Sequence, residues 1–396
     1  MDDASSPWLR LALCPQTPTA LLRELLSSPA DVLHQHTLKL SQWLAGKTPE
    51  AGPSISLPDD LQPSLEAWDK LAAHLRSTQL NTAVQKVVEW ASAEHNRHLL
   101  TPDHPQWPMQ LRALPDPPAL LYAMGETALL SANQIALVGA RRCSVDGKLT
   151  ARQLARDLAE SGWVVTSGLA VGIDTEAHLG CIEGGAPTLA VMATDAASCY
   201  PRKNRPLAAK ILDTGGCLIT ETPLGMPLER YCFPRRNRLI SALSHGVVVI
   251  EAAIKSGTIT TAKHAASQGR EVMAVPGSVR NPLVGGCHQL IRDGATLVTS
   301  AADVVECTGT GQPGGAQAKL TVGLNNGLTD KTKTTPHGTD SPQAATLLQA
   351  MGYDAAPLER LVLHTGMSAA ELVTVLTQLE LQGRVKRDTA GRYTRC

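Results

Sequence analysis

The feature that most constrains this chain is a repeated alternation of short apolar runs with segments of helical periodicity. Six such runs begin near residues 134, 163, 187, 217, 247 and 272, and each is followed by a polar loop and a helical segment. Nearly all-apolar strands that alternate with helices are typical of a parallel sheet covered by helices on both faces. The sequence therefore predicts an α/β fold with a doubly wound, mostly parallel sheet.

The loops after these strands form the predicted binding edge. Right-handed crossovers bring the carboxyl ends of parallel strands to one edge, and ligands of such sheets bind there. Glycines that precede helices offer free backbone N–H groups to anions. Three of the loops, 139–144, 200–205 and 231–241, add Arg or Lys. We expect a basic groove at this edge that accepts phosphate groups.

The last of these loops contains the only phenylalanine of the chain, Phe233, followed by Arg235, Arg236 and Arg238. Guanidinium groups suit phosphate oxygens, and an aromatic ring suits a nucleobase. The alternative is an exposed basic helix start whose Phe packs into the core beneath it. The two other basic loops at the same edge favour contact with single-stranded nucleic acid.

Charge and hydropathy exclude several classes of protein. The chain has 36 Lys and Arg against 36 Asp and Glu, so any site for a polyanion must be a local patch. The first residues, Met1-Asp2-Asp3, lack the basic and apolar regions of a signal peptide. No stretch approaches the ~18 apolar residues that a membrane span needs. We therefore expect a cytoplasmic protein without a membrane span.

The patterns that would indicate a metal or a cofactor are missing. The cysteines form no CxxC pair and the histidines form no HExxH pattern, so we expect free thiols and no metal site. A Walker loop is excluded because seven residues separate Gly139 from Gly147, and Leu149 replaces the required Ser or Thr. The GxGxxG fingerprint of NAD and FAD sites is also absent, so we expect no cofactor.

The titratable residues of the second helical segment do not predict catalysis. Asp174 and Glu176 are two positions apart and point in different directions on a helix, which argues against an acid–base pair. We expect Asp174 to cap its helix or to hold a nearby backbone amide. We expect His178 to pack or to form a hydrogen bond, because no nucleophile stands beside it in the sequence.

Further segments flank the predicted sheet. Residues 1–95 carry apolar residues at helical spacing around proline breaks, which predicts a small N-terminal helical domain. The sheet domain spans 96–307, and its proline-rich lead-in, 99–133, should run extended. Residues 308–341 are rich in Gly, Thr and Asn and predict a flexible linker.

Residues 342–396 have the pattern of a winged helix, with three predicted helices and a hairpin. The third predicted helix, 368–381, begins with a capping box, Ser368 to Glu371. It contains no Arg or Lys, which makes it a poor recognition helix for DNA. A contact with another protein is therefore as plausible for this domain as a contact with DNA.

Taken in order, the motifs resemble the DNA processing protein A family (DprA, also called Smf). They are Val138 to Arg142, Ser167 to Ala170, Gly172-Ile173-Asp174, Tyr200-Pro201, Phe233 to Arg238, Ser256-Gly257-Thr258 and Ala274 to Gly277. The resemblance covers about residues 99–307, and the C-terminal winged helix is similar to one found in many members of the family.

This resemblance implies an extended Rossmann-like domain that binds single-stranded DNA and forms a homodimer. It implies a protein that is not an enzyme, protects incoming DNA and loads a RecA-type recombinase on it during natural transformation. By motif, the DNA-binding positions would be Arg141, Arg142, Ser167, Gly168, Arg202, Lys203, Phe233, Arg235, Arg236, Asn237 and Arg238.

The sequence departs from the family pattern in two places. The loop 193–197 lacks the usual glycine and adds Asp195, whose charge we expect to repel phosphate. Residues 14–18 lack the glycine turn of a helix-hairpin-helix, so we predict no DNA binding by residues 1–95.

A nucleotide- or phosphate-binding hydrolase of the related Rossmann-like group is the alternative function. It would grip a phosphate with Ser256-Gly257-Thr258. The glycine pair of that group's phosphate loop is absent, and Thr261 stands where its catalytic Glu would be.

Overall fold

The structure is a computed structural model, and it describes most of the chain. The described residues are 6–15, 17–28, 30–45, 65–279, 281–309, 344, 347–348, 351, 356–388 and 390–395. The chain divides near residue 310 into two compact units. Within the described ranges, no helix is long and apolar enough to cross a membrane.

The large unit is built on a nine-stranded sheet in the order β1-β2-β6-β5-β4-β3-β7-β8-β9. The strands are β1 (Arg97–Leu100), β2 (Leu121–Gly125), β3 (Gln134–Val138), β4 (Val164–Ser167), β5 (Thr188–Val191), β6 (Cys217–Thr220), β7 (Gly246–Val249), β8 (Glu271–Ala274) and β9 (Thr296–Leu297). The seven strands from β3 to β9 pair in parallel, whereas β1 and β2 are antiparallel. The predicted mostly parallel α/β sheet is confirmed.

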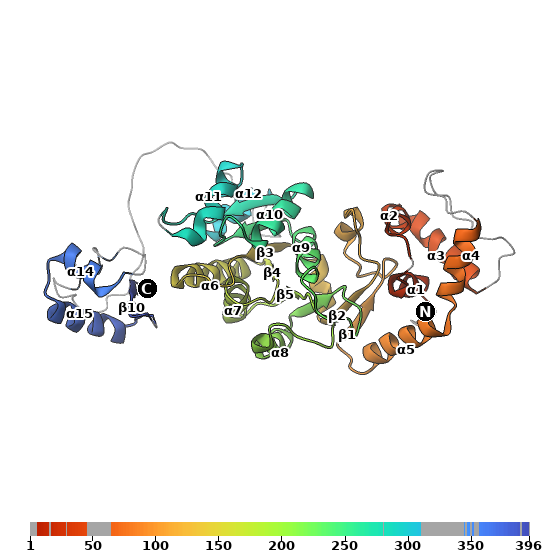
Figure 1. Cartoon of the computed structure of the whole chain (residues 1–396), viewed down its shortest axis with the longest axis horizontal. Coiled ribbons are helices and arrows are strands. Elements are labelled where there is room, and N and C mark those ends of the chain that lie inside the picture. Colours follow the sequence, from red (N-terminus) through yellow and green to blue (C-terminus); the bar gives the residue numbers. More distant parts are fainter. Residues whose placement is uncertain are drawn as a thin grey trace, which may run out of the picture. The chain divides into compact units, whose positions relative to one another are not determined.

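Helices cover both faces of this sheet. They are α6 (Val145–Glu160), α7 (Ile173–Glu183), α8 (Arg205–Asp213), α9 (Cys232–Leu243), α10 (Gly257–Ser267), α11 (Gly285–Arg292) and α12 (Ala301–Cys307). Apolar residues of α9, α10 and α11 form one core with the sheet, and those of α6, α7 and α12 form another on the opposite face. Figure 1 shows α9 and α10 on one side of the strands and α6 and α7 on the other.

The proline-rich lead-in contains more structure than its prolines predict. It contributes β2 and two short 3-10 helices, η3 (Met109–Ala113) and η4 (Thr127–Ser131). The antiparallel pairing of β2 with β6 joins segments almost a hundred residues apart, so local periodicity could not reveal it. Both β9 and α12 are likewise absent from the sequence prediction.

Helix α9 begins at Cys232, at the start of the basic segment 231–241. Pro234 is compatible with this start because the first turn of a helix needs no backbone N–H from its residues. This start places Phe233 on the helix, where its direction is fixed relative to the arginines that follow.

In the described part of the chain, five helices precede the sheet: α1 (Pro7–Leu13), α2 (Thr19–Ser27), α3 (Ala30–Leu44), α4 (Leu65–Leu75) and α5 (Thr78–Ser92). We call them the N-terminal module. Their core contains the buried Trp8, Trp43 and Trp68, and it continues into Leu99 and Tyr122 of the antiparallel strands. The module therefore packs against the β1–β2 edge of the sheet through a shared apolar core.

The C-terminal unit contains α14 (Leu358–Thr365), α15 (Ala369–Leu381) and a hairpin of β10 (Val385–Arg387) and β11 (Tyr393–Arg395). Ser368 and Glu371 form the predicted capping box of α15. These elements confirm the second and third helices and the hairpin of the predicted winged helix. The predicted linker lies outside the described residues except for 308 and 309.

His178 lies on α7 and is completely buried, as its predicted packing role requires. Its Nδ1 lies 2.9 Å from the Thr188 hydroxyl, which in turn donates to the Val165 carbonyl. The ring nitrogen therefore donates the hydrogen bond to Thr188. Burial, reinforced by the charge of Arg236, lowers the pKa of His178 from 6.5 to about 3.

This pKa predicts acid sensitivity. Below pH 6.5 the unfolded state binds a proton at His178 that the folded state does not, so the free energy of unfolding falls as the pH falls toward 3. When the pH is lowered from about 6.5 to 5, the free energy of unfolding of the wild type should fall by about 2 kcal/mol more than that of His178→Gln, because glutamine does not titrate. Urea unfolding of both proteins across this range measures the difference. Parallel pH curves would contradict the assignment.

Candidate nucleic-acid interface

The main cavity of the sheet edge lies where the strand order reverses. From β3 the chain continues to β4 on one side, whereas β7 lies on the other side of β3. A cavity of about 600 Å³ opens there, lined by the end of β3, the loops after β3 and β7, and the first turns of α9 and α10. A reversal point of this kind is where open α/β sheets bind ligands.

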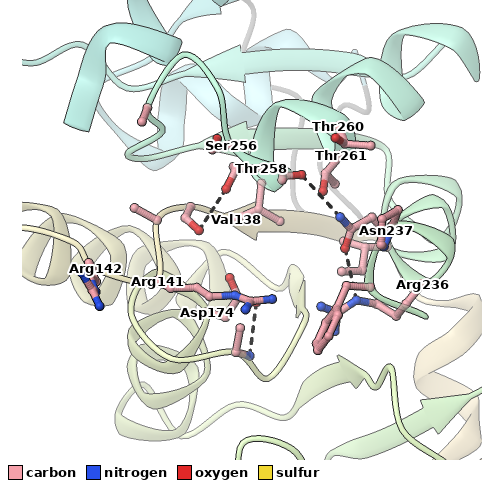
Figure 2. Close-up of a pocket in the computed structure, with 18 of the residues that line it drawn as sticks. Val138, Arg141, Arg142, Asp174, Arg236, Asn237, Ser256, Thr258, Thr260 and Thr261 are labelled. Carbon is pink, nitrogen blue, oxygen red and sulfur yellow. Dashed lines mark hydrogen bonds between the residues drawn. The ribbon is translucent and has the colours of Figure 1, made fainter. Parts of the chain in front are cut away.

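The two walls of this cavity differ in chemistry, as Figure 2 shows. One wall carries Arg141, Asp174 and Arg236, from the loop after β3, from α7 and from α9. The other carries hydroxyl groups of α10 and the residue before it: Ser256, Thr258, Thr260 and Thr261. The cavity thus combines cations with neutral hydrogen-bonding groups and the N-terminus of a helix, which suits an anion.

Arg236 holds the cationic wall together. The residue is 7% exposed, and its Nη1 donates to the carbonyl oxygens of Gly168, after β4, and Val191, at the end of β5. Its Nε donates to the Asn237 side chain at 3.2 Å. Burial lowers the pKa of Arg236 to about 10, against the opposing effect of Asp174. The guanidinium thus remains charged at neutral pH and bridges two strand ends to α9.

Asp174 holds the same loop from its other side. Its carboxylate accepts hydrogen bonds from the backbone N–H groups of Gly168, at 3.1 Å, and Ala170, at 3.3 Å. This confirms the prediction that Asp174 holds a nearby backbone amide. Burial raises its pKa, and the nearby charge of Arg236 works in the opposite direction. Gly168 is therefore held at its N–H by Asp174 and at its carbonyl by Arg236.

An aromatic pair lies beside this wall. The Arg141 guanidinium carbon lies 4.8 Å from the centre of the Phe233 ring, and the Tyr200 ring meets Phe233 edge-on at 5.7 Å between centres. Arg141 and Phe233 line both the main cavity and a second cavity of about 140 Å³, which Tyr200 and Pro201 also line. An aromatic ring with a cation on its face therefore marks the border between two adjoining cavities.

The other two arginines of α9 lie on a different face of the helix. Arg238 is buried and its Nη2 lies 2.6 Å from Glu221 and 3.5 Å from Asp116. Arg235 is half exposed and its Nε lies 3.4 Å from Glu221. Burial raises the pKa of Glu221, and the two arginines oppose this shift. These contacts tie α9 to the loop after β6 and to the proline-rich lead-in.

The remaining predicted positions differ in exposure. Arg142 is exposed and lines the main cavity. Ser167 is buried and donates to the Leu137 carbonyl at 2.6 Å, so its hydroxyl is used within the sheet. Arg202 and Lys203 are exposed in the short 3-10 helix η5 (Arg202–Asn204), directly after Pro201. They line neither cavity.

The structure also places two groups on which the sequence predictions depend. Asp195 is buried, lines neither of the two adjoining cavities and accepts a hydrogen bond from the Gly225 backbone at 2.7 Å. The expected repulsion of phosphate by its charge stays a prediction. Thr258, which the hydrolase alternative needs at a phosphate, donates its hydroxyl to the Gly139 carbonyl at 3.1 Å. Among the residues that the structure describes, no cluster of His, Cys, Asp and Glu could hold a metal ion.

Sequence reasoning did not select all the residues that line the cavities. Tyr200 was recognised only as part of a motif, and its role beside Phe233 depends on two loops meeting in space. Arg230 lines the main cavity and stands three positions before Phe233. Its only signal in the sequence was this basic neighbourhood, which cannot distinguish a cavity wall from a solvated surface.

Comparison with known proteins shows which family this chain resembles. A model of the family "DNA recombination-mediator protein A" matches residues 98–309, and one of the "DprA winged helix domain" matches residues 331–391. The chain is 38% identical to Protein Smf of Escherichia coli (strain K12), over 76% of this chain and 78% of that protein. It is 37% identical to DNA processing protein DprA of Bacillus subtilis (strain 168), over 67% and 90%.

A solved structure agrees with the sequence comparisons. The X-ray structure of DNA processing protein A from Streptococcus pneumoniae matches with a TM-score of 0.56 at 28% sequence identity. The match covers 73% of this chain and 97% of that chain. The likeness therefore covers most of this chain.

The contact between Gly168 and Arg236 gives a direct test of the cationic wall. A Cβ atom on Gly168 would lie 2.6 Å from Nη1 and 2.7 Å from Cζ and Nη2 of Arg236, so Gly168→Ala must displace a buried guanidinium. We expect a loss of about 1–3 kcal/mol of unfolding free energy. Gly257→Ala is the matched control, because a Cβ there meets nothing within 4 Å. Urea unfolding should separate the two variants, and equal stabilities would contradict the bridging role of Arg236.

Proposed function

This chain belongs to the DNA recombination-mediator protein A family, and from that membership we propose that it binds single-stranded DNA along the two adjoining cavities. The observation that carries the proposal is the Phe233 ring at their border, with the Arg141 guanidinium 4.8 Å from its centre. An aromatic platform for a base beside a cation for a phosphate is the common chemistry of single-strand binding.

The charge distribution around the main cavity supports this proposal. Arg141, Arg142, Arg230 and Arg236 line it, whereas Asp174 is the only acidic residue among the described residues that do so. The Asp174 carboxylate is already engaged with two backbone amides. An approaching phosphate therefore meets net positive charge, although the whole chain is neutral.

The aromatic border favours a single strand over a duplex. In a duplex the faces of the bases are stacked on one another, so no base could lie against Phe233 without unstacking. A single strand has its base faces free, and its backbone can follow a basic groove without sequence preference. We therefore expect backbone phosphates to contribute most of the affinity and the base contact to add selectivity for single strands.

The eleven positions from the family motif would divide into three groups. Arg141, Arg142, Phe233, Arg236 and Asn237 line the main cavity and would meet the strand. Ser167, Gly168 and Arg238 would act by holding the strand ends and α9 in place. Arg202, Lys203 and Arg235 are exposed and would attract phosphates at the periphery.

The biological role that we propose follows from the family. The chain would protect incoming single-stranded DNA, act as a homodimer, and load a RecA-type recombinase in the cytoplasm during natural transformation. No bond is made or broken in this role. The C-terminal winged helix would contact a further protein partner, because its third helix, α15, has no Arg or Lys to meet phosphates.

Phe233→Ala tests the base platform. If a base stacks on the ring, the variant should lose about 1–3 kcal/mol of binding free energy for a short oligothymidine. Tyr231→Ala is the matched control, because Tyr231 is an exposed aromatic two residues away that lines neither of the two adjoining cavities. Fluorescence anisotropy at several salt concentrations measures both variants, and affinity should fall as salt rises.

Two results would contradict the proposal. One is equal affinity of the wild type for single strands and duplex. The other is a Phe233→Ala variant that binds like Tyr231→Ala but unfolds more easily, since that would make Phe233 a core residue only.

A further inference from the structure

A third cavity, of about 460 Å³, lies within the N-terminal module between α1, α3, α4 and α5. Arg10 of α1 and Arg76, which follows α4, both line it, together with Ser6 and Asn81. No Asp or Glu is among the described residues that line it. This part of the chain has no role in the proposed groove, and its sequence predicted no contact with DNA.

Both arginines are held in place by neutral acceptors. Nη1 of Arg10 donates to the Leu75 carbonyl at 2.9 Å and to the Asn81 side-chain oxygen at 2.8 Å. Arg76 donates to the carbonyls of Trp43 and Leu44, the latter at 3.2 Å. Among the residues that the structure describes, no carboxylate forms a hydrogen bond or an ion pair with either guanidinium. Two fixed positive charges therefore share one cavity.

A purely structural reading explains only part of this arrangement. Leu75 ends α4 and Leu44 ends α3, so each arginine lies at the negative end of a helix and satisfies a free carbonyl group. A helix end carries about half a negative charge, whereas each guanidinium carries a full positive charge. The described residues of the cavity lining therefore keep a net positive charge after the helix ends are counted.

The Ser6 hydroxyl points to a ligand independently. The residue lines the cavity, and its buried hydroxyl oxygen has no hydrogen-bond partner among the residues that the structure describes. A buried hydroxyl without a partner is unfavourable by roughly 1–3 kcal/mol, so such groups are usually satisfied. An anion between the two arginines would accept this hydrogen bond. Asn81 can also donate from its amide nitrogen, because its oxygen already accepts from Arg10.

We propose that this cavity is a phosphate-binding site, with Arg10 and Arg76 supplying the charge and Ser6 and Asn81 supplying hydrogen bonds. Arginine and hydroxyl donors around a cavity whose described lining contains no Asp or Glu match the oxygens of a phosphate group. The phosphate is either that of a DNA strand that extends beyond the groove or a free phosphate. Binding at this site does not depend on the groove proposed above.

Thermal unfolding of the full chain in phosphate tests the site. Sodium phosphate is compared with sodium chloride at equal ionic strength and pH. Phosphate also stabilises folded proteins nonspecifically, so specific binding is the part of the rise in midpoint temperature that is lost when the two arginines are removed. We expect phosphate to stabilise the wild type and to stabilise an Arg10→Gln/Arg76→Gln variant much less. An Arg23→Gln/Lys86→Gln variant removes the same charge from exposed positions of the module and should respond like the wild type.

Ser6→Ala keeps the experiment decisive if the arginine variant folds poorly. Removing a buried, unpartnered hydroxyl should leave stability in chloride unchanged or raise it, while phosphate affinity falls roughly tenfold. A role limited to capping helix ends predicts no effect of Ser6→Ala on the phosphate response. The proposal is overturned if phosphate does not stabilise the wild type beyond chloride, or if all variants respond equally.

Oligothymidine affinity, measured on the same variants, identifies the source of the phosphate. A several-fold loss in Arg10→Gln/Arg76→Gln, without loss in the exposed-charge control, identifies a strand phosphate. Unchanged strand affinity with a lost phosphate response supports a site for free phosphate. If the chain binds no strand at all, the proposed function fails, while the phosphate titration still decides this site.

Discussion

The buried guanidinium of Arg236 is the interaction on which the candidate site depends. It joins α9 to the carbonyl groups at the ends of two neighbouring strands, and Asp174 holds the same loop through backbone amides. A buried charged group is stable only when its hydrogen bonds are satisfied. Few placements of α9 relative to the two strand ends therefore allow the hydrogen bonds of Arg236. The direction of Phe233, one turn earlier on the same helix, follows from it.

Helical periodicity divides the arginine cluster between two tasks. Phe233, Arg236 and Asn237 are three and four positions apart and face the cavity, whereas Arg235 and Arg238 face Glu221 and Asp116. A run of arginines that looks uniform in the sequence thus contains a structural bridge, a buried ion pair and a peripheral cation. Removing different members of the run should therefore have different physical effects on stability and on binding.

Local patterns were sufficient to predict the parallel strands, their helices and the edge at which the basic loops meet. They could not assign the faces of α9, because these depend on its start at Cys232 and on partners far away in the sequence. The same limit applies to the surroundings of Asp195, because its hydrogen-bond partner Gly225 lies thirty residues away in the sequence. The antiparallel strands β1 and β2 were missed because their pairing is long-range and their segment is rich in proline. The resemblance to a family supplied the motif positions but not their separate roles.

Photochemical crosslinking of a short oligothymidine to the full chain, mapped by mass spectrometry, tests the central claim most directly. The account predicts crosslinks that concentrate on Phe233 and Tyr200, at the border of the two cavities. It would be contradicted by crosslinks confined to the C-terminal unit, or by crosslinks spread over the surface with none in peptides that line these cavities.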